Sequence, residues 1–405
     1  MQRFAIILRG LSVSAAMLTA LATGPSAHAS SLRAAFAGAC ERTPEIQALV
    51  ARRAVPDAKR EAAGALLPGG PWATVTHRTD ALTNDRGTRQ YDAELTLPIW
   101  LRGERGAALA AALTEGERIE AEIAFRRLEV ARRVRDAYWM VVEAREKVAI
   151  AERRHATAAT LLQDVRGQAQ TGQTGLLEAK LAAADVGDAD ATLAGRRAEL
   201  KQAMIAFSVL TGRESPAMFK EKDIGRATPA NHPRIALRGR AVEKAEADQN
   251  LVWATDRDRP EFGAFASNAR DTSAEPNVTS LGVRLKIPFA YDAINRPKRA
   301  AAAAEVVAAK EELALAQREV AGDAAQARAK LDGARQQLVA LEARRAGLAE
   351  VVQLTQQAQR AGQVPLNDLI RSRLQLFEAD LARATARVAA ERARSDLNQA
   401  LGLEP

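Results

Sequence analysis

Few residues in this sequence have side chains that commonly carry out chemistry. It contains four histidines, one of them (His28) in the N-terminal apolar segment, and a single cysteine, Cys40. The sequence shows no cluster of metal-ligand residues, no nucleophile motif and no phosphate-binding loop. It therefore predicts a protein that is not an enzyme and that uses no cofactor and no bound metal ion.

The chemistry that remains is that of charged groups near the ends of helices. Glu178 and Asp368 each lie three residues after a residue that breaks a helical pattern, Gly175 and Pro365 respectively. The helix dipole favours an acidic residue in a first turn, and this explains both residues without any function. Arg371 follows Asp368 at the i+3 spacing, at which opposite charges on a helix can pair.

These helix starts belong to two halves of the sequence that resemble each other at a constant offset of 190 residues. A constant offset over this distance indicates a duplicated unit that is far longer than a solenoid repeat. We expect two tandem repeats, 30–210 and 232–405, joined by a linker at 211–231. The matching segments are Leu95-Thr96-Leu97-Pro98-Ile99 with Leu285-Lys286-Ile287-Pro288-Phe289, Thr171-Gly172-Gln173 with Ala361-Gly362-Gln363, and Thr211-Gly212 with Leu401-Gly402.

Each half contains, in order, a shorter helix, two strands, a very long helix, a turn and a second long helix. The aromatic content is only 4%, and abundant Ala, Leu, Glu, Arg and Gln favour long helices, so the fold class is mainly α with a small β part. The expected helices are 33–66 with an interruption at Pro56, 103–170, 176–210, 233–255, one that Pro297 opens and that ends near 361, and a last one that ends near 401. The expected strands are 72–79, 90–99, 261–269 and 278–289.

The apolar residues of these elements follow the periods of helices and strands. Residues 90–99 alternate, with Tyr91 and Leu95 on one face and Asp92 and Glu94 on the other, as in a strand with one apolar side. The helix at 103–170 would be roughly 100 Å long at 1.5 Å per residue. Its coiled-coil-like seam consists of Ile119, Ile123, Val130, Val134, Ala137, Val141 and Val148.

Four strands neither close a barrel nor cover their own edges. Their apolar-out, polar-in alternation is typical of a membrane β-barrel, and several copies of the chain are the simple way to close one. Three copies would supply twelve strands. Taken singly, the helices also fit an antiparallel coiled-coil spacer and the strands a small soluble sheet, but neither explains the duplication.

The N-terminus predicts export from the cytoplasm. Residues 1–29 resemble a secretory signal peptide, with Arg3 and Arg9 near an apolar stretch and a small-x-small site at Ala27-His28-Ala29. The net charge of +8 is not concentrated in a basic block with interleaved aromatics, so nucleic acid is not an expected partner. A single cysteine forms no intrachain disulfide; we expect Cys40 to be a buried thiol, with lipidation after Gly38-Ala39 as the alternative.

The doubled pattern resembles the TolC-like family of trimeric outer-membrane efflux proteins, over nearly the whole mature chain. The residues that carry the resemblance are 95–99 and 285–289 at the strand ends, the glycine turns at Gly172 and Gly362, and the helix ends at 210–212 and 401–402. The resemblance implies a homotrimer in which twelve strands form a barrel in outer-membrane lipid and the long helices form a periplasmic helical barrel.

The resemblance also implies roles for the two helical turns, which would lie at the periplasmic tip. There the family meets a periplasmic adaptor protein that serves an inner-membrane pump, and the candidate contact residues are Gly172, Gln173, Gly175, Gly362, Gln363 and Pro365. Acidic residues early in the helix after the second turn ring the constriction in this family. The candidate gate residues are Asp368, Arg371 and Glu178. Arg371 stands where a second aspartate would be expected, which is a departure from a two-aspartate gate.

The function implied is a passive duct that carries small toxic compounds or metal cations out of the cell. A protein-secretion duct of a type I system is one alternative. A periplasmic coiled-coil adaptor or scaffold is the other; it would have one helical hairpin flanked by a lipoyl-like β-domain.

Overall fold

The structure is a computed structural model that describes residues 32–172, 175–216, 221 and 231–405. The expected signal peptide, 1–29, and the tip candidate Gln173 lie outside the described residues. So does most of the expected linker 211–231, of which 211–216, Glu221 and Asn231 are described.

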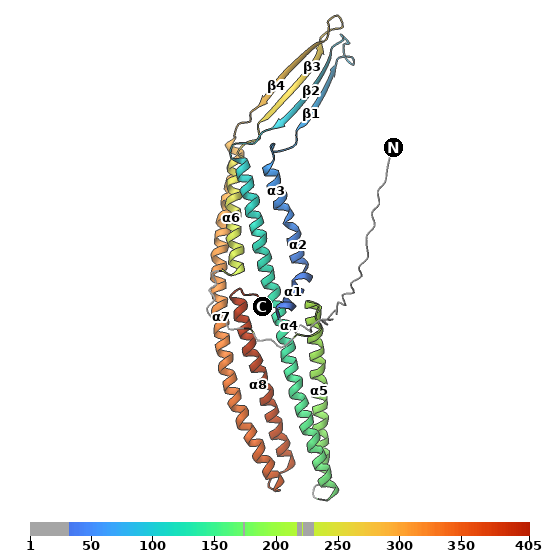
Figure 1. The fold of residues 1–405 in the computed structure, drawn as a ribbon, viewed down its shortest axis with the longest axis vertical. Helices are drawn as coiled ribbons and strands as arrows, with labels where there is room; N and C mark the ends of the chain where they lie inside the picture. Colours follow the sequence, from blue (N-terminus) through green and yellow to red (C-terminus); the bar gives the residue numbers. More distant parts are fainter. Residues whose placement is uncertain (1–31, 173–174, 217–220, 222–230) are drawn as a thin grey trace, which may run out of the picture.

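The molecule is elongated, with a β-sheet at one end and helical hairpins at the other (Figure 1). Two long helices, α4 (Glu104–Gln170) and α7 (Asp292–Arg360), run along the whole helical part. Between the sheet and the middle of the molecule they are accompanied by α1 (Leu32–Arg42), α2 (Pro44–Arg52), α3 (Ala54–Gly64) and α6 (Pro233–Ala254). Beyond the middle they pair with the return helices α5 (Leu176–Thr211) and α8 (Leu366–Ala400).

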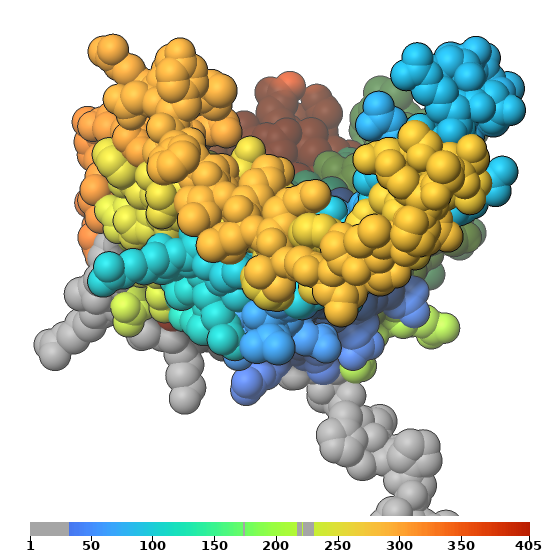
Figure 2. All heavy atoms as spheres, turned by 90° about the horizontal axis from the view of Figure 1, so that it is seen from above, coloured from blue at the N-terminus to red at the C-terminus, as the bar shows by residue number. Residues whose placement is uncertain are grey.

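The sheet has four antiparallel strands in the order β1 (Trp72–Thr79), β2 (Arg89–Pro98), β3 (Glu261–Arg270) and β4 (Val278–Lys286). The two halves of the sequence meet where β2 pairs with β3. Seen from above, the strands form a curved band, with the blue β1–β2 hairpin beside the yellow-orange β3–β4 hairpin (Figure 2). The last strand ends at Lys286 rather than at the expected Phe289, because Pro288 has no N–H to donate to a ladder.

The strand register gives the sheet one apolar and one polar face. Val75, Ala93, Ala266 and Leu281 lie side by side across the four strands, and Val75 and Leu281 are 79% and 81% exposed. The next positions across the sheet are Thr74, Glu94, Phe265 and Gly282 on the opposite face. Exposed apolar side chains on one face need an apolar environment outside this chain.

The helices start and end close to the expected residues, with two exceptions at prolines. Pro56 does not interrupt a helix; it is the third residue of α3, where its missing N–H has no intrahelical acceptor in any case. The breaks lie instead at Thr43 and Arg53. Pro297 does not open α7, which begins five residues earlier at Asp292 and contains this proline near its start.

The expected seam of α4 lies in the core. Ile119, Val134 and Val141 are at most 1% exposed. Near the middle of the molecule the seam packs against Phe36 of α1 and Phe207 of α5. The long-helix periodicity therefore correctly identified which face of α4 is buried.

Glycine conformations mark the equivalent ends of the two hairpins. Gly172 and Gly362 end the long helices with φ of +74° and +73°, and Gly212 and Gly402 end the return helices with φ of +72° and +80°. Glycine adopts this left-handed conformation without the steric cost that a side chain imposes. Glycines that are 190 residues apart in the sequence thus have the same left-handed backbone conformation.

Cys40 is a buried thiol in the middle of the helical part. It is 7% exposed and lies in α1, whose Leu32, Phe36 and Ala39 are also buried. Burial raises the pKa of the thiol to about 11. A lipid-anchored chain beginning at Cys40 would lack the first eight residues of α1 and their packing, so the structure favours the thiol.

We therefore expect Cys40 to be unreactive in the folded protein, because only the thiolate attacks a maleimide and this thiolate is both scarce and buried. Intact-protein mass spectrometry after maleimide treatment at pH 7 should show no adduct before unfolding, one adduct after unfolding in denaturant, and no acyl group. Rapid labelling of the native protein, or the mass of a lipid on Cys40, would contradict this assignment.

Candidate functional site

The turns that follow α4 and α7, which contain the described tip candidates, lie at the end of the molecule farthest from the sheet (Figure 1). Gly172 and Gly362 turn the chain out of the long helices, and both are exposed. Gly175 and Pro365 occupy the N-cap positions of α5 and α8 in extended conformation. Gln363 is exposed in the second turn and donates its backbone N–H to the carbonyl of Ala358. The two turns thus present exposed backbone and small side chains at one end.

Glu178 folds back over the start of its own helix. A Cβ atom placed on Gly175 would lie 2.7 Å from Oε2 of Glu178. The carboxylate therefore sits beside the free N–H groups of the first turn of α5, where a negative charge is stabilised. Glycine at position 175 leaves room for this arrangement.

Asp368 and Arg371 are placed differently. Asp368 is half-buried in the first turn of α8, where its backbone N–H donates to the carbonyl of Pro365 at 3.1 Å. Arg371 lies one turn later and is exposed. Among the described residues no ion pair joins these two side chains, so the pairing that their spacing allows is not made within one chain.

A small apolar core holds the two hairpins together just above the tip. Leu161 and Val165 of α4 and Ala182 of α5 pack against Leu366 and Leu369 of α8. Leu366 and Leu369 flank Asp368 in sequence, so this core fixes the position of the gate candidate. Movement of one hairpin against the other must disturb these contacts.

Ion pairs line a cavity of about 350 Å³ further along the same hairpins. Arg154 contacts Asp185 at 3.4 Å and lies over the ring of Phe377, 5.1 Å from its centroid. Arg345 contacts Asp380 at 2.9 Å. Burial lowers the pKa of Arg373 in this cavity below its ordinary value, which the nearby Asp185 partly offsets.

A buried polar network joins Glu221 to α4 and to the end of α8. Arg135 of α4 is 2% exposed and donates from Nε to Oε1 of Glu221 at 2.9 Å. Glu221 is 7% exposed and also accepts hydrogen bonds from Ser395 Oγ and Asn398 Nδ2 of α8, each at 2.8 Å. Gln399 accepts from Arg135 and donates to the carbonyl of Leu128 at 2.8 Å. This network ties Glu221, α4 and the end of α8 together.

The sequence interpretation missed this network. A signal was present, because Arg135 lies at helical spacing from buried Ala131, Tyr138 and Val142 and so interrupts an apolar stripe. A charged residue at such a position needs a buried partner. Its partner Glu221 lies 86 residues away in the linker, and no local pattern identifies it.

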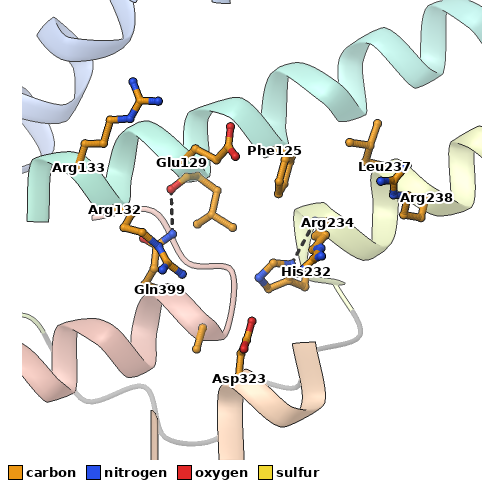
Figure 3. Close-up of a pocket in the computed structure, with 12 residues that line it drawn as sticks. Phe125, Glu129, Arg132, Arg133, His232, Arg234, Leu237, Arg238, Asp323 and Gln399 are labelled. Carbon is orange, nitrogen blue, oxygen red and sulfur yellow. Dashed lines mark hydrogen bonds between the residues drawn. The ribbon is translucent and has the colours of Figure 1, made fainter. Parts of the chain in front are cut away.

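A cavity of about 510 Å³ lies where α8 ends and α6 begins (Figure 3). His232 caps α6, since its Nδ1 accepts the backbone N–H of Arg234 at 3.1 Å. Burial, and then the charge of Arg234, lower the pKa of His232 below its ordinary value. The charged residues around it are mainly basic, so the cavity suits an anion better than a metal cation. They are Glu129, Arg132, Arg133, Arg234, Arg238 and Asp323.

Within the described residues, no three His, Cys, Asp or Glu side chains are placed to hold a metal ion. None of the helices in that part of the chain is long and apolar enough to span a membrane.

Comparisons with known proteins give the site its context. Residues 38–213 match the model of the family described as outer membrane efflux protein. The cobalt-zinc-cadmium resistance protein CzcC of Cupriavidus metallidurans is 27% identical over 214 residues. That alignment covers 50% of this chain and 51% of CzcC, so it spans about half of each protein.

The fold is shared with solved structures over 92% of the chain. A membrane protein from Pseudomonas aeruginosa superposes with a TM-score of 0.73 at 18% identity and 93% coverage of its chain. The Vibrio cholerae outer membrane protein VceC gives 0.72 at 16% identity and 96% coverage, and the Campylobacter jejuni outer membrane channel CmeC gives 0.70 at 14% and 85%. At these identities the likeness establishes the fold.

Proposed function

We propose, from the match of residues 38–213 to the outer membrane efflux protein family, that three copies of the chain form a duct through the outer membrane and periplasm. The observation that carries the proposal is the open sheet. β1 and β4 each have an unpaired edge in the single chain, and the apolar face is exposed. Pairing β4 of one copy with β1 of the next closes a twelve-stranded barrel whose apolar face meets lipid and whose polar face lines a channel.

The helical part supports the same assembly. Several apolar side chains of the long and return helices are more than half exposed in the single chain, and neighbouring copies in a ring of helices would cover them. They are Met140, Ile205, Val209, Val307, Val339 and Leu354. In this duct the hairpin turns with Gly172, Gly175, Gly362, Gln363 and Pro365 form the periplasmic tip and meet an adaptor protein that serves an inner-membrane pump.

We assign the closure of the tip to Asp368 and Arg371. Asp368 is held in place by the apolar core around it, and the exposed Arg371 is positioned to reach a neighbouring copy. The third gate candidate, Glu178, is turned back over Gly175 and serves the start of α5 instead. The second turn, and not the first, thus carries the gate.

The cargo we propose is metal cations or other small toxic compounds, and the relative CzcC favours the metal cations. The duct does not need a metal site of its own to pass a metal ion. The alternative of an adaptor or scaffold fails, because the described residues form two helical hairpins and a four-stranded sheet. A protein-secretion duct would share this architecture. Only an experiment that identifies the cargo can distinguish it from an efflux duct.

The test is deletion of the gene, followed by growth in cobalt, zinc and cadmium salts and in a panel of antibiotics. Loss of resistance that the wild-type gene restores, together with a trimer in the outer-membrane fraction, is the expected result. A soluble periplasmic monomer would overturn the proposal. Unchanged resistance with loss of one secreted protein would instead assign the duct to protein secretion.

A further inference from the structure

Two glycines on the polar face of the sheet each lie beneath a bulky side chain. Gly282 of β4 pairs directly with Phe265 of β3, and Phe265 pairs with Glu94 of β2. A Cβ atom on Gly282 would lie 2.4 Å from Cζ of Phe265, and one on Gly263 would lie 2.6 Å from Oε1 of Glu94. The ring and the carboxylate therefore lie along the sheet over the two glycines instead of standing out from it.

Arg284 holds both side chains in this position. Its Nη1 donates to Oε2 of Glu94 at 2.6 Å, and its guanidinium carbon lies 5.6 Å from the centroid of the Phe265 ring. The Glu94 side chain is only 15% exposed although it lies on an uncovered face. The pair also cancels its own charge, so this part of the wall is nearly neutral.

In a barrel of twelve strands, the distance that side chains of the polar face project from the wall affects the width of the bore. Side chains fill the interior of a barrel of about 8 strands, whereas barrels of about 16–18 strands leave an aqueous channel. A twelve-stranded barrel lies between these limits, and threefold symmetry would place three copies of each polar-face residue around its axis. Three aromatic rings standing inward would narrow it substantially.

We propose that Gly263 and Gly282 set the width of the duct at the level of the sheet, by letting Glu94 and Phe265 lie flat on the wall. The inference rests on the proposed function, since it requires the polar face to line the channel. It adds that these residues determine the largest solute that the barrel passes. Solutes too bulky for a wall with upright Phe265 rings are then the cargo for which the two glycines are needed.

The test uses trimers in planar bilayers, with polyethylene glycols of increasing mass added on the side of the sheet. A polymer that enters the pore lowers the conductance, so the largest polymer that lowers it gives the size limit. Entry from this end is not limited by a constriction at the tip. Gly282→Val should raise the Phe265 ring and reduce the mass of the largest polymer that enters about twofold, since the bore is close to side-chain dimensions. Ser280→Val is the matched control on the same strand and face, opposite Ser267, and should behave as wild type.

Two further variants identify the cause. Gly282→Val combined with Phe265→Ala should restore the wild-type polymer limit, which a general distortion of the sheet would not allow. Phe265→Ala alone should leave the limit unchanged, because a ring that lies flat does not obstruct the bore. This second result stands even if Gly282→Val fails to assemble.

Two results would contradict the proposed role of the glycines. A Gly282→Val trimer with the wild-type polymer limit overturns the inference, and so does a Phe265→Ala trimer that admits clearly larger polymers, because the ring would then already be upright. In both cases the wild-type protein still forms a pore, so the proposed function is not contradicted. Wild-type protein that forms no pore would instead contradict the proposed function, and the inference would fall with it.

Discussion

Replacing Glu221 by glutamine should lower the free energy of unfolding by about 3 kcal/mol, because it leaves the buried Arg135 guanidinium without a counter-charge. The neutral amide of the new side chain still accepts some of the hydrogen bonds of the carboxylate, so we expect the lower end of the range for a broken buried ion pair. Thermal unfolding followed by circular dichroism, at one fixed protein concentration, is the measurement. The fixed concentration matters because assembly itself stabilises an oligomer.

A surface pair on α5 supplies the matched control. Glu199 accepts from Arg196 at 2.8 Å, but their side chains are 50% and 30% exposed. Glu199→Gln should therefore change the free energy of unfolding by less than about 0.5 kcal/mol. If Glu221→Gln is equally mild, the ion pair between Glu221 and Arg135 does not contribute measurably to stability.

The double variant Arg135→Gln/Glu221→Gln tests whether the loss comes from an unpaired charge. Because neither side chain is charged, it should be more stable than the sum of the two single variants predicts. It should not reach wild-type stability, since Ser395 and Asn398 lose a charged acceptor. Strict additivity would mean that the pair is not energetically coupled.

The sequence predicted the parts of this fold that depend on local periodicity. The apolar spacing recurs several times within α4 and within β2. The buried face of α4 and the apolar face of β2 were therefore correctly identified. The turns at Gly172 and Gly362 were also found, because left-handed backbone selects glycine strongly. The predicted helix break at Pro56 and the predicted helix start at Pro297 were wrong. Proline is tolerated within the first turns of a helix and does not by itself mark its first residue.

The parts that were missed depend on contacts between distant segments. Glu221 meets Arg135 across 86 residues, and Arg284 meets Glu94 across 190. The flat position of Phe265 follows from a glycine on the neighbouring strand, which is visible only when the register is known. Single-sequence patterns contain neither kind of information, although the interrupted stripe at Arg135 pointed to a missing partner.

The second large effect is expected at the tip. In the proposed trimer three Asp368 carboxylates face a common axis, and three exposed Arg371 guanidinium groups are available to neighbouring copies. Exposed ion pairs contribute about 0.5 kcal/mol each, so three of them shift a closed–open equilibrium about tenfold. Because no such pair forms within the single described chain, the whole shift belongs to the assembly.

Asp368→Ala should therefore raise the open fraction of single channels about tenfold by removing three ion pairs of about 0.5 kcal/mol each, and should admit large antibiotics through the outer membrane. Arg371→Ala should have the same effect, whereas exchange of the charges in Asp368→Arg/Arg371→Asp should restore closure. Asn367→Ala, an exposed and uncharged change beside Asp368 in the same first turn, controls for damage to the start of α8. Wild-type gating in Asp368→Ala would mean that this carboxylate only complements the helix dipole. A charge-exchanged variant as leaky as the single variants would show that closure depends on something other than pairing between these two residues.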